Sequence, residues 1–118
     1  MFASIDNLSY LAEELKTFRQ DLHKNPELGF KEIRTSKKIY NELKDMGLDV
    51  HSNIGKTGVV GVLKKGNSNK RIMLRADMDA LPIQETSNHD YISQNPGVMH
   101  ACGHDGHTTM LLGAAKYL

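Results

Sequence analysis

The residues best suited to chemistry lie between His100 and His107, where the chain reads HACGHDGH. This run holds three of the six histidines and the only cysteine. Cys102 and His104 are two positions apart, so in an extended segment their side chains point the same way. Thiolate and imidazole are ligands that transition metals prefer. The spacing therefore predicts a metal site at Cys102 and His104. A buried cysteine among surface histidines is the alternative.

The chain after this cluster supports the prediction. Apolar residues from Met110 to Leu118 recur at three- and four-residue spacing, which is typical of a helix. Cys102 would then precede a helix N-terminus, where backbone N–H groups favour the thiolate form that binds metal.

Two carboxylates form a second candidate group. Asp77 and Asp79 flank one residue, so both can point to one side of an extended segment. Such a carboxylate binds a metal directly, or it accepts the free N–H of a metal-bound imidazole and fixes its tautomer. A solvated strand end is the alternative. Arg75 would pair with these carboxylates, bind a substrate carboxylate or lie on the surface.

The remaining histidines and methionines indicate structural roles. His23 lies in a helix stop, and Glu27 is placed to cap the helix that follows. His51 and His89 have no supporting neighbours and are expected to be solvated. Four methionines are expected in the core or as gap fillers: Met73, Met78, Met99 and Met110.

Hydrophobic spacing predicts the helices that must position these groups. Leucines and Phe18 recur every three or four residues over 6–24, and a similar pattern covers 31–46. Gly47 is well placed just beyond the second helix. A third helix is expected to begin near Asp105.

Strands are expected between the second and third helices, over 48–54, 57–63 and 71–75. The second of these contains a continuous apolar run, which is typical of a buried strand. Residues 84–99 are polar and predict a long loop, a feature that is usually functional in a compact domain. Helices that cover a sheet give an α/β fold, in which ligands gather beyond strand ends.

The composition of the chain limits which classes of protein it can belong to. The chain has 118 residues, of which 39% are hydrophobic and 25% charged, with a formal net charge of +1. These values predict one globular domain without nucleic-acid or membrane partners. A single cysteine, no signal-peptide pattern and no long apolar run predict a cytoplasmic protein. The last residues lack helix stop signals, which predicts a chain cut within an element.

Several segments together resemble the amidohydrolase branch of the dinuclear-metal aminoacylase and glutamate carboxypeptidase superfamily. This zinc-peptidase-like branch includes hippurate hydrolase, N-acetyl-diaminopimelate deacetylase and the plant auxin–amino acid conjugate hydrolases. The matching segments follow the family's order and span most of the chain: residues 19–30, 57–60, 74–83 and 99–115.

The resemblance implies a fold and a set of roles. The fold is α/β, with helices packed on a mixed sheet, and residues 1–118 form the N-terminal part of a zinc-peptidase-like (phosphorylase/hydrolase-like) catalytic domain. Cys102 and His104 match metal ligands. Asp79 matches a catalytic residue that orients a ligand, and Asp77 stands where related branches carry a ligand histidine. A complete active site holds two divalent ions, Zn²⁺ or Mn²⁺.

The reaction implied is hydrolysis of the amide bond of a small N-acyl amino acid, with a glutamate as general base. In the family this glutamate, two further ligand histidines and a dimerisation domain follow the segment that this chain covers. The chain is then the first part of an amidohydrolase. Alternatively, it is an inactive fragment that folds alone or assembles with another chain and binds metal weakly or not at all. An unrelated structural zinc module is a third interpretation. An exposed apolar face on the last helix favours self-association.

Overall fold

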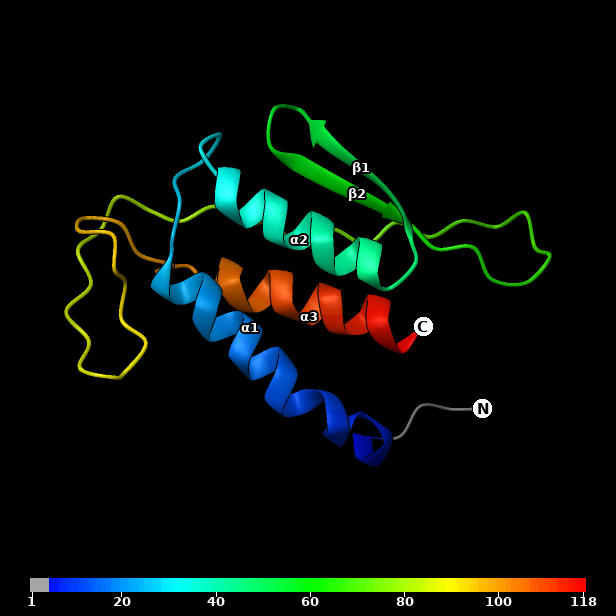
Figure 1. Cartoon of the computed structure of the whole chain (residues 1–118), viewed down its shortest axis with the longest axis horizontal. Helices are drawn as coiled ribbons and strands as arrows, with labels where there is room; N and C mark the ends of the chain where they lie inside the picture. The colour runs from blue at the N-terminus through cyan, green and yellow to red at the C-terminus, as the bar shows by residue number, and fades with distance from the viewer. Residues whose placement is uncertain (1–4) are drawn as a thin grey trace.

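The computed structural model describes residues 5–118, with side chains described from residue 8. It confirms the α/β class, with helices packed beside a β-hairpin (Figure 1). The elements in chain order are a 3-10 helix η1 (Ile5–Leu11), α1 (Ala12–Lys24), α2 (Ile33–Asp45), β1 (Asp49–Ile54), β2 (Gly58–Val62) and α3 (His104–Tyr117).

Helices α1 and α3 lie side by side and carry much of the core. The helix predicted over 6–24 is present, but its first part is the tighter 3-10 helix. Phe18 and Leu22 from α1 pack with Leu112 from α3 in one buried cluster. The two helices approach closely at Gly113, where an added Cβ would lie 2.8 Å from Cδ1 of Leu15.

Helix α2 lies between the hairpin and the α1–α3 pair (Figure 1). Its Ile39 and Leu43 join the buried cluster together with Leu48 and Val50, which come from the start of the hairpin. Glu27 caps this helix as expected, because its carboxylate accepts the backbone N–H groups of Arg34 and Thr35 at 3.0 and 2.6 Å.

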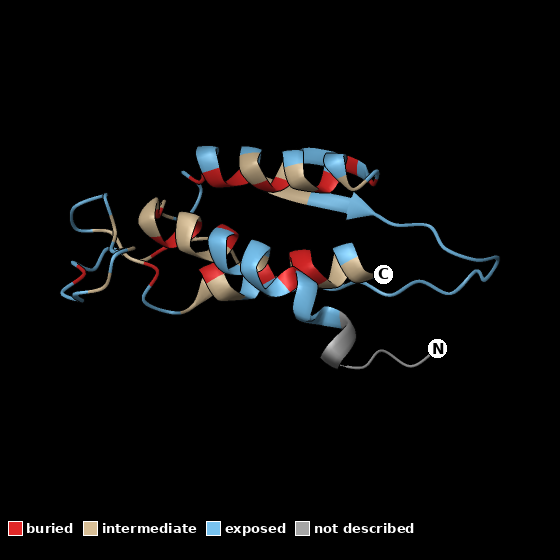
Figure 2. Cartoon of the chain, turned by 60° about the horizontal axis from the view of Figure 1, so that its bottom comes forward, coloured by how far each residue is buried: buried red, intermediate tan, exposed pale blue. Residues whose placement is uncertain are grey.

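Strands β1 and β2 confirm the predictions over 48–54 and 57–63 and pair antiparallel, with Asp49 opposite Val62. Among residues 5–118, parallel pairing is limited to an isolated bridge between Leu28 and Ala80. The expected burial of the second strand is wrong. Val60 and Val62 are 45% and 38% exposed, because only α2 covers the hairpin and the outer face stays open (Figure 2).

The strand predicted over 71–75 is absent. Ile72 and Met73 are 89% and 90% exposed, and no strand of the described residues runs beside them. Apolar spacing alone therefore misassigned this segment, which belongs to the long loop that leaves the helices after β2 and returns toward them (Figure 1). The loop over 84–99 is confirmed.

The methionines divide between core and surface. Met78 packs against the buried cluster and Met99 is half-buried, as expected. The core prediction is wrong for Met73 and for Met110, which is 66% exposed on the outer side of α3. Within residues 5–118, none of the helices has both the length and the apolar character needed to cross a membrane.

Candidate metal centre

The start of α3 is the place where the candidate residues meet. The backbone N–H of Ala80 donates to the carbonyl oxygen of Glu27 at 2.8 Å. On its other side, Leu81 exchanges backbone hydrogen bonds with Met99 at 2.9 and 3.0 Å. The segment that carries Asp77 and Asp79 is therefore fixed between the end of α1 and the residues that lead into α3.

His104 is held by Asp79. Its Nδ1 lies 2.9 Å from both the Oδ1 atom and the backbone oxygen of Asp79. Because both are acceptors, Nδ1 carries the proton of the neutral ring and Nε2 keeps its lone pair. The imidazole is thus presented in the tautomer that binds metal through Nε2, with a carboxylate behind it.

Asp77 lies on the other side of the same imidazole, with its Oδ2 atom 3.6 Å from Nε2 of His104. Its Oδ1 is 2.5 Å from Nη2 of Arg75, and its backbone oxygen accepts the hydroxyl of Thr108 at 2.8 Å. Of the three interpretations of Arg75, the structure shows the ion pair, with an arginine side chain that is 77% exposed. A carboxylate and an imidazole nitrogen therefore face the same space.

Cys102 has an exposed, free thiol two residues before His104. Gly103 adopts a left-handed conformation with φ of 79°, which turns the chain from Cys102 into α3. A residue with a side chain is strained there, so glycine allows the turn. The structure thus brings Asp77, Asp79 and His104 together, while ligation by Cys102 and His104 stays a prediction.

A second polar cluster, next to this one, was not predicted. His23 is buried between two carboxylates: its Nδ1 lies 2.7 Å from Oδ2 of Asp105 and its Nε2 lies 3.0 Å from Oε1 of Glu85. Arg19 also donates to Oδ2 of Asp105 at 2.9 Å. His23 is therefore more than a helix stop.

His89 belongs to the same cluster, so its expected solvation is wrong. Its Nε2 lies 3.1 Å from Oε1 of Glu85, and its side chain is 31% exposed. The i, i+4 spacing of Glu85 and His89 was the one sequence signal for this contact. His51, in contrast, is 55% exposed as expected.

At Glu85 and Asp105, hydrogen bonds and nearby positive charge lower the pKa, whereas burial raises it. Burial raises the pKa of Glu85, but its hydrogen bonds to His23 and to the Ser93 backbone hold the pKa below the ordinary value. Burial likewise raises the pKa of Asp105, while the bond to His23 and the charge of Arg19 bring the pKa below its usual range. Both groups are therefore carboxylates at neutral pH.

His100 lies beside this cluster, with its ring centroid 6.4 Å from that of His23. It is only 4% exposed, and neither ring nitrogen has a hydrogen-bond partner among the described residues. Burial lowers the pKa of His100, which favours the neutral ring.

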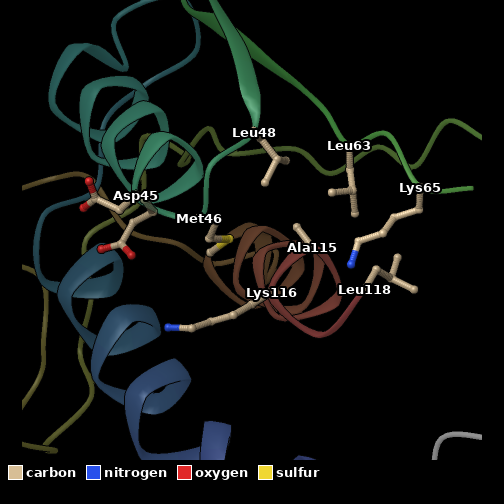
Figure 3. Close-up of a pocket in the computed structure, with 9 residues that line it drawn as sticks. Asp45, Met46, Leu48, Leu63, Lys65, Ala115, Lys116 and Leu118 are labelled. Atoms are coloured by element: carbon tan, nitrogen blue, oxygen red, sulfur yellow. The ribbon is translucent and has the colours of Figure 1, made fainter.

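A separate pocket lies away from these clusters. It has a volume of about 350 Å³ and is lined by the end of α2, the residues just before β1 and just after β2, and the last turn of α3, where Met46, Leu48 and Ala115 face one another (Figure 3). It is at the opposite end of α3 from His104, so it does not belong to the candidate metal centre.

Comparison with known proteins agrees with this geometry. Residues 73–118 match the sequence profile of Peptidase family M20/M25/M40. The chain is 62% identical over 108 residues to a hippurate hydrolase of Campylobacter jejuni, covering 92% of this chain and 28% of the relative. It is 46% identical over 115 residues to an N-acyl-L-amino acid amidohydrolase of Geobacillus stearothermophilus, covering 94% and 31%.

A solved structure shows the same backbone arrangement. A dinuclear metal binding peptidase of Bacillus subtilis, from the M20 family, superposes with a TM-score of 0.88 at 41% identity. The match covers 93% of this chain and 31% of that structure. The chain therefore spans less than a third of the length of these relatives.

Proposed function

Sequence and fold relate this chain to Peptidase family M20/M25/M40, and on this premise we propose that it carries the first part of the active site of a metal-dependent amidohydrolase. The reaction is hydrolysis of the amide bond of a small N-acyl amino acid. Residues 1–118 form the N-terminal portion of the catalytic domain in this proposal, and the remainder of the catalytic domain and a dimerisation domain lie outside them.

One observation carries the proposal: the contact between Asp79 and His104 at 2.9 Å. It leaves Nε2 of His104 free for a metal and supplies the carboxylate that commonly stands behind a ligating histidine. The exposed thiol of Cys102 adds a second donor nearby. Sulfur, nitrogen and carboxylate oxygen together suit Zn²⁺ or Mn²⁺. The complete site holds two such ions.

When bound, the ions supply Lewis acidity and an activated water. Asp79 then keeps Nδ1 of His104 protonated and its ring in place. The carboxylate of Asp77 faces the same nitrogen of His104 and contributes negative charge to the site. The general base is a glutamate outside these residues, as the family resemblance implies. We further propose a cytoplasmic location, which the free cysteine supports.

The second candidate is a catalytically inactive fragment. It is favoured by the number of ligands, because the residues described here offer only two of the proposed metal ligands, Cys102 and His104. Such a chain would fold alone or assemble with another chain. Met110 on α3 and Leu118 just after it are 66% and 61% exposed, which favours self-association.

A chimeric enzyme tests the proposed function. Residues 1–118 replace the matching segment of the Campylobacter jejuni hippurate hydrolase, and release of glycine from hippurate is measured with Zn²⁺ or Mn²⁺. We expect a chimera that hydrolyses hippurate and a Cys102→Ser version that does not. A folded, metal-loaded chimera without activity would show that this chain does not supply a working half of the site.

A further inference from the structure

We propose that His23, Glu85 and His89 form a site for a divalent cation of the zinc class, separate from the candidate centre at Cys102 and His104. The three side chains come from α1 and from the loop over 84–99. Each offers one ligand atom, and these three atoms lie within 4.8 Å of one another. Two imidazoles and one carboxylate are a common protein ligand set for Zn²⁺.

The distances suit a small cation. Oε1 of Glu85 lies 3.0 Å from Nε2 of His23 and 3.1 Å from Nε2 of His89. Ligand atoms at about 2.0 Å from a tetrahedral zinc are about 3.3 Å from one another. The three groups therefore need only small side-chain movements to enclose an ion.

Groups behind the ligands hold two of them in place. Oδ2 of Asp105 accepts a hydrogen bond from Nδ1 of His23 at 2.7 Å, which turns Nε2 toward Oε1 of Glu85 at 3.0 Å. A bound ion would replace the proton that Nε2 donates to Glu85. The backbone N–H of Ser93 donates to Oε2 of Glu85 at 2.6 Å, so Oε1 is the oxygen that faces the histidines. A carboxylate behind a histidine is the usual support of a bound metal.

The surroundings close the site on one side and leave an entrance on the other. The side chains of His23 and Glu85 are 4% and 2% exposed, whereas that of His89 is 31% exposed. The ring of Tyr91 stacks on His89 with centroids 3.8 Å apart and fixes the plane of the ligand. Two carboxylates, Glu85 and Asp105, against one arginine give the cluster negative charge when the histidines are neutral.

Cobalt distinguishes this site from the one at Cys102. Co²⁺ replaces Zn²⁺ in such sites, gives visible d–d absorption in a tetrahedral site, and adds a thiolate charge-transfer band only where a cysteine binds. The chain with Cys102→Ser and His104→Gln is titrated with Co²⁺, and the bound ion is counted by equilibrium dialysis. We expect one ion per chain, with d–d absorption and without the thiolate band.

His89→Ala in the same background should weaken cobalt binding at least about 10-fold, because it removes one ligand. The matched control is His51→Ala, an exposed histidine on β1 that should leave binding unchanged. Far-UV circular dichroism checks that each variant is folded. Binding that survives His89→Ala, or that falls equally in both histidine variants, would refute the site.

The native background provides a second test, which does not depend on the double variant. There, His89→Ala should reduce the number of bound Co²⁺ ions by one and leave the thiolate band intact. Absence of any cobalt in the folded Cys102→Ser, His104→Gln chain would mean that the three groups form hydrogen bonds only, and would overturn the proposal.

Discussion

Nδ1 of His23 lies 2.7 Å from Oδ2 of Asp105, although the two residues are 82 positions apart in the sequence. The contact joins the last turn of α1 to the first turn of α3. Asp105 follows His104 directly, so the same contact fixes the helix start that presents the candidate ligand. This buried pair therefore contributes both to the packing of α1 on α3 and to the assembly of the site.

Replacing His23 with alanine should lower the free energy of unfolding. His23→Ala leaves two buried carboxylates, Glu85 and Asp105, without their shared partner, and breaking a buried ionic network costs about 3–5 kcal/mol. The free energy of unfolding is measured by urea titration at pH 7. His51→Ala is the control and should stay within about 0.5 kcal/mol. Equal, small effects in both variants would make the His23 contacts energetically unimportant.

Acid should destabilise the chain through the same carboxylates. The pKa values of Glu85 and Asp105 are lowered in the folded state, so the unfolded state binds protons first as the pH falls. Their stabilisation is complete above the ordinary carboxyl pKa, and it is lost as the pH falls through the lowered folded values. Urea titrations between pH 7 and pH 3 should show this decline.

Glu85→Gln tests which group is responsible, because an amide does not titrate in this range. Its unfolding free energy should be lower at pH 7 and should change less between pH 5 and pH 3 than that of the unaltered chain. Parallel pH curves for the two proteins would assign the acid sensitivity to other groups.

Cys102→Ser should reduce the metal bound by the chain, because serine lacks the thiolate that the proposed centre uses. Elemental analysis after dialysis against Zn²⁺ gives the metal content of both proteins. Cys102 is exposed and packs against little, so the unfolding free energy should remain nearly unchanged. Equal metal content would remove Cys102 from the ligand set.

Asp79→Ala should lower turnover of the hippurate hydrolase chimera about 10–100-fold, the usual effect of losing the carboxylate behind a ligating histidine. Turnover is measured at saturating metal, and thermal unfolding is followed in parallel. Asp49→Ala, at an exposed carboxylate on β1, is the control. A large loss of stability with normal turnover would make Asp79 a structural residue.

The 118-residue chain by itself should not hydrolyse N-acyl amino acids. Two proposed ligands, Cys102 and His104, leave the coordination shells of two ions incomplete, and the proposed general base lies outside these residues. Free amino acid is assayed after incubation with Zn²⁺ or Mn²⁺ and a panel of N-acetyl and N-benzoyl amino acids. Metal-dependent release that Cys102→Ala abolishes would show that the site is complete without further residues.

Local patterns predicted most of the elements. Apolar spacing identified α1, α2 and α3, and short apolar segments identified the two strands, because these signals reflect contacts between residues near in sequence. The pairing of the two strands in a hairpin was not predicted. The pairing of Asp77 and Asp79 with the cluster at His104 followed from residue type and family resemblance together. The structure confirms that Asp77, Asp79 and His104 meet.

Long-range contacts explain what was missed. Nothing near His23 in the sequence indicates that Glu85 and Asp105 enclose it, since both lie more than sixty residues away. The strand expected over 71–75 depends on neighbouring strands, which sequence periodicity does not reveal. The burial of β2 was predicted wrongly for the same reason. An apolar run does not show how many layers of structure cover the strand.

The exposed segment over 71–75 lies directly before the candidate site. Its residues belong to no helix or strand, so its amide hydrogens should exchange with solvent far faster than those of Leu22 in α1 or Leu112 in α3. Asp77 and Asp79 follow it directly. An ion bound beside Asp77 and His104, with Asp79 behind the histidine, would restrict this segment, and the entropy of that ordering would be part of the measured affinity. Slowed amide exchange over 71–79 on adding Zn²⁺ would therefore report occupancy of the site before any substrate is present.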